Sequence, residues 1–188
     1  EVHILGNVCC GLPAGSYGDR EAARSLAAKN LEVVTAQSLD LVVTDCSSCA
    51  SFLKQYPGLF DEADALHEQS KRVASKVRDM VEQALSFPPP RLDEAEQVTV
   101  TYHDPCHASR GQNLAAQPRQ ILESLPGVEY REMPEADWCC GGAGSYALSH
   151  FETAMKVLER KMANVEKAGA NVLATSCPAC MIQLASGV

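Results

Sequence analysis

The chain has 188 residues, of which 46% are hydrophobic and 21% charged, and its formal net charge is -8. This length and balance allow an apolar core without disulfides, and the acidic charge argues against nucleic acid as a partner. Since no apolar run approaches the roughly 20 residues that cross a bilayer and no signal peptide leads the chain, we expect a cytoplasmic protein, held at the inner membrane face only through a complex.

The first residues have the composition of a strand, VHIL at 2–5. Because the chain opens at Glu1 rather than at a methionine and enters this segment almost at once, we interpret it as part of a longer protein.

Residues 9–49 predict four features in order. They are a Cys-Cys-Gly loop at 9–11, a helix at 20–37 with Asp19 as N-cap, a strand at 41–44, and a Cys-Ser-Ser-Cys turn at 46–49. Helix formers fill the helical segment, and aspartate is a favoured N-cap residue. The strand therefore leads directly to the second pair of cysteines.

The middle of the chain predicts helix and then a linker. Apolar residues at helical intervals over 61–85 indicate one long helix or two shorter ones. Three consecutive prolines follow at 88–90 and cannot continue a helix, so we interpret 86–97 as a linker.

The same four features return in the second half. They are Cys-Cys-Gly at 139–141, a helix with an apolar stripe of Phe151, Met155, Leu158, Met162 and Val165, a strand at 171–175, and Cys-Pro-Ala-Cys at 177–180. The second motif follows the cysteine pair by 36 positions in the first copy and by 37 in the second. Upstream of the second copy we expect a strand at 98–103, a short helix near 118–125 and a strand at 128–133.

A strand, a crossover helix and a second strand normally form a parallel pair. We therefore predict an α/β fold with two pseudo-symmetric halves, each a small parallel sheet with crossover helices. The first repeat covers 1–85 and the second, complete repeat covers 98–188. Because the first copy lacks a counterpart of Cys106, we expect a tenth cysteine at the end of a strand roughly 30 residues upstream of the chain.

Nine cysteines punctuate this pattern, namely Cys9, Cys10, Cys46, Cys49, Cys106, Cys139, Cys140, Cys177 and Cys180. An odd number among helices and strands is not typical of a disulfide framework, so metal or cluster ligation is favoured, with an iron–sulfur centre preferred to structural zinc. Adjacent cysteines serve one tetrahedral ion poorly, and five thiols per site exceed the four that structural zinc accepts. Gly11 and Gly141 would let the loop turn with positive φ and bring amide N–H groups towards sulfur.

The spacing Cys, Cys-Cys-Gly, Cys-x-x-Cys resembles the cysteine-rich CCG domain found in the B subunit of heterodisulfide reductase. The segments YHDPCH, ADWCCGGAGSY and ATSCPACMIQL most resemble the iron–sulfur subunit of glycolate and lactate oxidases, which is also seen in the C subunit of anaerobic glycerol-3-phosphate dehydrogenase. The resemblance covers almost the whole chain.

This resemblance implies a noncubane [4Fe-4S] cluster held by Cys106, Cys139, Cys140, Cys177 and Cys180. It implies that Cys9, Cys10, Cys46 and Cys49 are the remaining ligands of another cluster. Because that site lacks a fifth cysteine, it is expected to hold a cluster, to hold zinc, to form a disulfide or to stay empty. The upstream ferredoxin-like Cys-x-x-Cys-x-x-Cys runs of glycolate oxidase subunits do not occur in this chain.

The implied function is electron transfer within an oxidoreductase complex. Its partners would be a flavoprotein that oxidises glycolate or lactate and supplies the electrons, and further iron–sulfur subunits. The chain carries no Gly-x-Gly-x-x-Gly motif after a strand, and we expect no catalytic residue in it. One alternative is a catalytic cluster that reduces a disulfide, as in heterodisulfide reductase. Another is a zinc-stabilised interaction domain.

Five further residues lie beside the cysteines of the second copy. His103 and His107 are weighed as ligands or donors to a cluster against packing or capping roles, and Asp104 is expected to cap the turn or to anchor the loop. Trp138 and Tyr146 are expected either to shield a cluster from water or to pack in the core.

Overall fold

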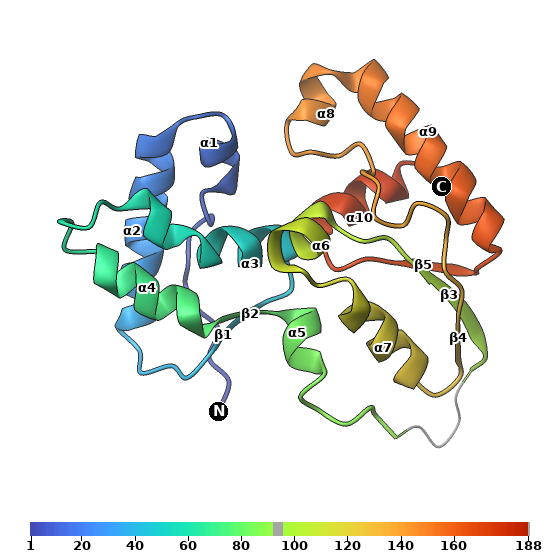
Figure 1. Ribbon diagram of the computed structural model, residues 1–188, viewed down its shortest axis with the longest axis horizontal. Helices are drawn as coiled ribbons and strands as arrows, with labels where there is room; N and C mark the ends of the chain where they lie inside the picture. Colours follow the sequence, from blue (N-terminus) through green and yellow to red (C-terminus); the bar gives the residue numbers. More distant parts are fainter. Residues whose placement is uncertain (92–95, 188) are drawn as a thin grey trace. The chain divides into compact units, whose positions relative to one another are not determined.

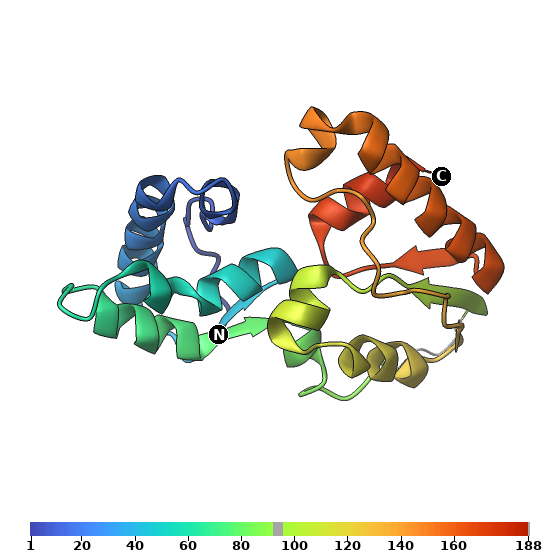
Figure 2. The same cartoon turned by 45° about the horizontal axis from the view of Figure 1, so that its top comes forward.

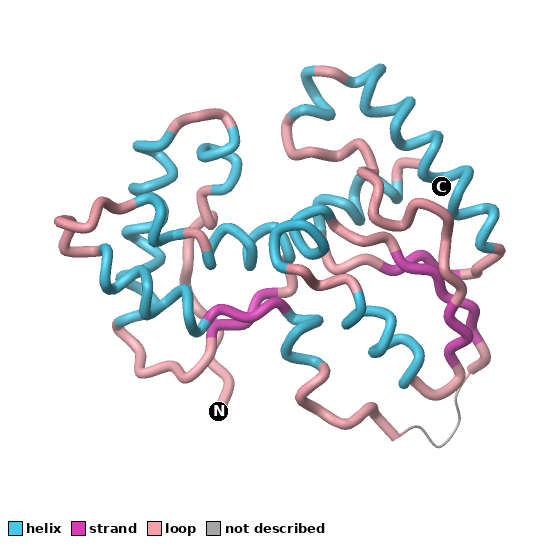
Figure 3. Tube along the Cα trace, in the orientation of Figure 1, coloured by secondary structure: helices cyan, strands magenta, loops and turns pink. Residues whose placement is uncertain are grey.

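The computed structural model describes residues 1–91 and 96–187, and it divides into two compact units (Figure 1). The first unit comprises Glu1–Thr44 and Ser48–Asp79, and the second comprises Asp45–Ser47 and the chain from Met80 onward. Each unit contains a small parallel sheet with helices, which confirms the predicted α/β fold with two halves (Figure 3).

The first unit is built around two parallel strands, β1 (Val42–Thr44) and β2 (Val77–Asp79). Its helices are α1 (Leu12–Ser16), α2 (Arg20–Thr35), α3 (Ser47–Lys54), the 3₁₀ helix η1 (Tyr56–Leu59) and α4 (His67–Lys76). The buried face of α2 carries alanine and aliphatic side chains at helical spacing, and these pack in one core with Val73 and Val77. Cys10 belongs to that core.

The second unit contains a parallel sheet in the order β4-β3-β5. Its strands are β3 (Val98–Tyr102), β4 (Val128–Tyr130) and β5 (Val172–Ala174). Its helices are α5 (Met80–Ala84), α6 (Cys106–Gln112), α7 (Ala116–Ser124), α8 (Tyr146–Ser149), α9 (Phe151–Ala168) and α10 (Pro178–Ala185). Within this unit α9 and α10 lie on the β5 side of the sheet and α7 lies on the β4 side (Figure 2).

Most of the predicted elements are confirmed. Helix α2 begins after Asp19, whose carboxylate accepts a 2.9 Å hydrogen bond from the Ala22 N–H, as expected for an N-cap. The predicted strands that precede the two Cys-x-x-Cys motifs are β1 and β5, and β3 and β4 also lie where the alternating patterns indicated. The repeat in the sequence is therefore a repeat of local structure.

One expectation was wrong, and two were confirmed only in part. Residues 2–5 form no strand; Val2 and Ile4 are 93% and 97% exposed, and no described strand pairs with them. The segment 61–85 holds two helices, as one alternative had it, but β2 lies between them because Val77 is fully buried beside β1. Of the predicted stripe of α9, Leu158 is buried and Met155 and Met162 pack against its core cluster, whereas Phe151 is 63% exposed, so the stripe is confirmed except at its first residue.

The sequence did not predict the short helices α1, η1 and α8, nor α3, α6 and α10, which each begin at or beside a cysteine of a predicted motif. Of the expected linker at 86–97, residues 92–95 lie outside the described residues, and 86–91 form no helix or strand. Among the helices in the described part of the chain, none combines the length and apolar character needed to span a bilayer.

Candidate metal centre

Both Cys-Cys-Gly loops turn at a glycine in the left-handed region, as predicted. Gly11 has φ 94° and Gly141 has φ 92°. In each loop the first cysteine is exposed and the second is buried. At the second loop the Gly141 N–H donates a 3.3 Å hydrogen bond to Sγ of Cys139, so the turn presents an amide to sulfur.

The five cysteines of the second set come from three separate segments of the second unit. Cys106 begins α6 just beyond the end of β3, and Cys177 is the N-cap of α10 just beyond the end of β5. Cys139 and Cys140 lie in the loop before α8, and Cys180 is in α10. Since the carboxyl ends of neighbouring parallel strands meet at one edge of a sheet, β3 and β5 deliver their cysteines to the same place.

The thiols of this set act directly on one another. Hydrogen bonds from the thiols of Cys139 and Cys180 lower the pKa of Cys140, against the effect of its burial. Hydrogen bonds to Cys140 and Cys177, together with burial, raise the pKa of Cys180. Desolvation, followed by the charges of Cys140 and Cys177, raises the pKa of Cys106. The five sulfurs therefore form one electrostatically connected group.

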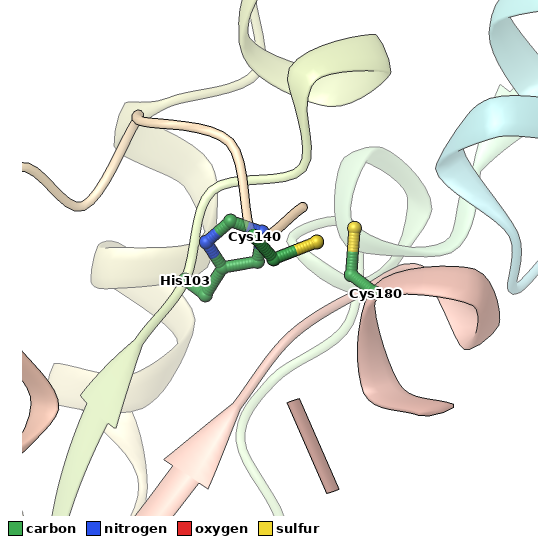
Figure 4. Close-up of side chains that lie close together, drawn as sticks. All are labelled: His103, Cys140 and Cys180. Atoms are coloured by element: carbon green, nitrogen blue, oxygen red, sulfur yellow. The ribbon is translucent and has the colours of Figure 1, made fainter. Parts of the chain in front are cut away.

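His103 lies against this group. Its imidazole, Cys140 and Cys180 offer ligand atoms within 4.8 Å of one another, and all three residues are buried (Figure 4). In Figure 4 the two sulfurs point into the same region beside the ring. The ring contributes to the lowered pKa of Cys140, yet neither of its nitrogens reaches hydrogen-bond geometry with a residue that the structure describes. Since buried polar groups normally have a hydrogen-bond partner, the ring of His103 fits a site in which these thiols hold a further group.

Asp104 anchors the loop that carries Cys106. Its buried carboxylate accepts two hydrogen bonds from the Arg119 guanidinium of α7, at 2.9 and 2.8 Å. It does not cap α6, since the N-cap of that helix is Pro105 and no side chain caps it. The anchoring alternative for Asp104 is thus confirmed, and the capping alternative is wrong.

Lys161 is a residue of this region that sequence reasoning missed. Its side chain is 2% exposed, and Nζ donates to the backbone oxygens of Glu135 and Ala136, the latter at 3.3 Å. Burial lowers the pKa of Lys161, and the charge of Cys140 opposes that shift. Its position in the buried stripe of α9 was the available signal, because a lysine on such a face needs specific partners.

In the first unit, Cys9, Cys10 and Cys49 come together. A hydrogen bond from the Cys49 thiol outweighs burial and lowers the pKa of Cys10 to about 6. Two side chains also bind the backbone of this loop: Tyr56 Oη donates to the Cys10 carbonyl at 2.8 Å, and Asn30 Nδ2 donates to the Cys9 carbonyl at 3.0 Å. This arrangement gives the first loop a buried polar support.

Cys46 belongs by its contacts to the second unit. It packs against the buried cluster of Cys140, Leu158, Cys177, Cys180 and Leu184. The structure therefore brings three of the four cysteines of the first set together within the first unit and assigns the fourth to the other unit.

A pocket of about 390 Å³ lies beside Cys139 in the second unit. Its lining includes Trp138, Lys156, Arg160 and Lys161. The Arg160 guanidinium lies 4.0 Å from the centre of the Trp138 ring, which is 48% exposed. Trp138 therefore borders an open pocket rather than forming part of the core.

Tyr146 and His107 also lie at the surface side of the site. Tyr146 is 40% exposed and stacks on the ring of His150 at 4.3 Å. His107 has Nδ1 3.6 Å from Sγ of Cys106. The core-packing alternative is thus wrong for both aromatic residues beside the second loop, whereas His107 does contact a candidate ligand.

The sequence matches the cysteine-rich domain described as CCG over residues 1–54 and 100–185, which include all nine cysteines. The chain belongs to the CCG cysteine-rich domain family. The two matched segments contain both Cys-Cys-Gly loops and both Cys-x-x-Cys motifs.

Three relatives extend this comparison. The chain is 33% identical over 183 residues to the probable glycolate oxidase iron-sulfur subunit of Bacillus subtilis, covering 96% of this chain and 41% of the relative. It is 26% identical over 182 residues to lactate utilization protein A of Bacillus licheniformis, covering 95% and 75%. It is 28% identical over 186 residues to the D subunit of the dihydromethanophenazine:CoB--CoM heterodisulfide reductase of Methanosarcina acetivorans, covering 95% and 44%. The chain thus spans less than half the length of the first and third of these relatives.

Proposed function

We propose that this chain is the electron-transfer part of an oxidoreductase that oxidises a 2-hydroxy acid, glycolate or lactate, and that it holds an iron–sulfur cluster for that purpose. The observation that carries the proposal is the group of five connected thiols in the second unit, Cys106, Cys139, Cys140, Cys177 and Cys180. Membership of the CCG family and relatives named as iron–sulfur subunits support it.

The donor set fits a polynuclear cluster better than a single zinc ion. Structural zinc takes four ligands in a tetrahedron. Here an imidazole and the thiols of Cys140 and Cys180 offer ligand atoms within 4.8 Å of one another, and electrostatic interactions connect them to the other three thiols, one of which is on the residue adjacent to Cys140. By the family resemblance the cluster is of the noncubane [4Fe-4S] type, and the five cysteines are its ligands.

A bound iron–sulfur cluster supplies one-electron transfer at this site. The protein's own residues hold and shield it. Cys140, Cys177 and Cys180 are buried and keep water away from the inner side, while the Asp104–Arg119 pair fixes the loop of Cys106. The Gly141 N–H faces sulfur, and amide donors of this kind stabilise negative charge on a cluster.

The electron donor is proposed to be a flavoprotein subunit, because two of the relatives are named for glycolate and lactate and the chain has no flavin motif of its own. Further iron–sulfur subunits would complete the complex, and the location would be the cytoplasm or the inner membrane face through that complex. We further propose that Cys9, Cys10 and Cys49 of the first unit bind metal less firmly than the second set, and that their site holds a cluster, holds zinc or stays empty.

The experiment is metal and sulfide analysis of the anaerobically purified chain and of matched serine variants. Cys106→Ser and Cys140→Ser should lose most of the iron and acid-labile sulfide, together with the visible absorption and the paramagnetic signal of the reduced protein. The Cys9→Ser variant should lose a smaller part of the iron and acid-labile sulfide, or none. Zinc without iron or sulfide in the parent chain would instead support the interaction-domain alternative and overturn the proposal.

One observation favours a second candidate function, in which the cluster itself reduces a disulfide. Cys139 and Cys106 are exposed, and the pocket beside Cys139 offers Lys156 to an anionic substrate, whereas Arg160 in the same pocket is already paired with Glu135. A disulfide takes up two electrons and two protons to give two thiols. Pre-reduced protein would be mixed with oxidised glutathione and the thiols titrated. Two thiols released for every two electrons withdrawn would favour this function, whereas reoxidation by a quinone analogue without reaction with the disulfide would favour the relay.

A further inference from the structure

His103 is a buried histidine whose ring lies beside Cys140 and Cys180 but makes no hydrogen bond of ordinary geometry with any described residue. It is 1% exposed, and both Nδ1 and Nε2 lack a hydrogen bond among the residues that the structure describes. Leaving a polar atom buried and unsatisfied costs about 1–3 kcal/mol. A cost of this size argues against an incidental placement of the ring, and it calls for a group that the ring would contact.

The backbone gives the ring little freedom to find a partner elsewhere. The His103 N–H donates a 2.9 Å hydrogen bond to the carbonyl of Ala174, the last residue of β5. The next residue is also held, because the Asp104 N–H donates to the Ala136 carbonyl at 3.0 Å and its carboxylate is bound by Arg119. These bonds hold the backbone of His103 in place, and from there its ring lies beside Cys140 and Cys180 (Figure 4).

The ring could bind metal through one nitrogen, or it could donate a hydrogen bond to sulfur from one nitrogen. The two roles differ in whether the other ring nitrogen carries a proton. A ligating imidazole binds metal through one nitrogen and carries its proton on the other, which almost always donates to a carboxylate, carbonyl or water. Here that second nitrogen would be a buried N–H without an acceptor among the described residues, a rare arrangement. A ring that donates one N–H to sulfur leaves only a bare acceptor nitrogen, which burial tolerates better.

We propose, on the basis of the cluster assigned above, that His103 donates a hydrogen bond to sulfur at the Cys140 and Cys180 side of that cluster and thereby raises its reduction potential. The proton stays on nitrogen throughout. The hydrogen bond strengthens when the cluster gains an electron, because added negative charge makes sulfur a better acceptor. The reduced state is therefore stabilised more than the oxidised state, and hydrogen bonds to cluster sulfur are a recognised means of tuning potential.

The first test uses the parent protein alone, prepared anaerobically with ¹⁵N-labelled histidine. Pulsed paramagnetic resonance of the reduced protein should detect an exchangeable proton coupled to the cluster and only weak coupling to histidine nitrogen. Strong coupling, as from nitrogen bonded to iron, would overturn the donor role. Absence of both the proton and the nitrogen coupling would overturn any contact with His103.

The second test compares variants by iron content and by redox titration. His103→Leu removes the donor and should shift the midpoint potential to a more negative value with unchanged iron and sulfide per chain. His103→Gln restores an N–H and should return the potential part of the way. The control is His150→Leu, which removes an exposed histidine of the same unit and should leave the potential unchanged.

The outcomes separate this inference from the proposed function. A parent chain without iron and sulfide would contradict the cluster assignment itself. A parent chain with a cluster whose potential is the same in the leucine variant would contradict only the role of His103. Loss of iron in both His103 variants would also overturn the donor role, because a hydrogen-bond donor is not required for ligation.

Discussion

The Arg119 guanidinium binds both carboxylate oxygens of Asp104, at 2.9 and 2.8 Å, and so ties helix α7 to the loop that precedes Cys106. The same guanidinium also contacts both oxygens of Glu132, at 2.7 Å each. Asp104 is buried whereas Glu132 is half exposed, so the two pairs differ in how much they depend on the arginine.

Removal of the arginine should be costly because it leaves a buried carboxylate without its counter-ion. We expect Arg119→Met to lower the free energy of unfolding by about 3 kcal/mol or more. Asp104→Asn should cost less, since Arg119 keeps Glu132. Urea unfolding followed by circular dichroism checks both. Lys71→Met, which breaks an exposed pair with Glu68, is the control and should cost less than about 1 kcal/mol; an equal loss in the lysine and arginine variants would contradict the expectation.

Glu132 should make stability depend on pH in the acid range. Burial alone would raise the pKa of Glu132, but hydrogen bonds from Arg119 and Tyr130 outweigh it and hold the pKa below its ordinary value of 4.5. The unfolded chain then binds more protons in this range, so the contribution is fully present above the ordinary pKa and is lost as pH falls through the folded value.

The measurement is the loss of unfolding free energy between about pH 7 and about pH 3 for the parent and for Glu132→Gln. The variant should lose less, because a glutamine does not titrate. An equal loss of unfolding free energy in the two proteins would show that Glu132 contributes nothing to the dependence of stability on acid pH.

Gly141 should be intolerant of any side chain. Its φ of 92° disfavours other residues, and an added Cβ would overlap the carbonyl oxygen of Ala154 in α9. Gly141→Ala should therefore lower the unfolding free energy by more than the ~1–2 kcal/mol of left-handed strain alone, and reduce iron content.

Two glycines provide graded controls for this substitution. Gly144 has φ 62° with open space around it, so Gly144→Ala should show the strain without the overlap. Gly58 has an ordinary φ and open space, so Gly58→Ala should be within about 0.5 kcal/mol of the parent. The unfolding free energy should therefore fall in the order Gly58→Ala, Gly144→Ala, Gly141→Ala. Any other order would contradict the combination of strain and overlap inferred for Gly141.

Tyr56 should stabilise the first Cys-Cys-Gly loop through its hydroxyl. The group donates to the Cys10 carbonyl at 2.8 Å and accepts from Asn30 Nδ2 at 2.9 Å, and the side chain is fully buried. Tyr56→Phe should cost about 1–3 kcal/mol, because it leaves a buried carbonyl without its donor. Thermal unfolding and amide exchange at residues of that loop would test it, with Tyr146→Phe at the exposed tyrosine as control. Unchanged exchange in the loop would argue against this support.

Much of the fold could be predicted because the signals are local. Asp19 caps α2 through a residue three positions away, and the glycines that follow the cysteine pairs adopt the positive φ that a tight turn needs. Strand β2 could not be predicted in the same way. Its three residues continue a helical pattern, and only burial of Val77 beside β1 makes them a strand.

By itself the sequence determined which residues can hold metal and how they repeat, because cysteine chemistry and loop spacing are properties of short segments. The tertiary structure alone decided which thiols meet, that Cys46 packs in the second unit, and that His103 is buried without a partner among the described residues. It also decided that Arg119 holds Asp104. These relationships join residues from different elements, and packing between elements depends on the shape and burial of the whole unit, which no local pattern encodes.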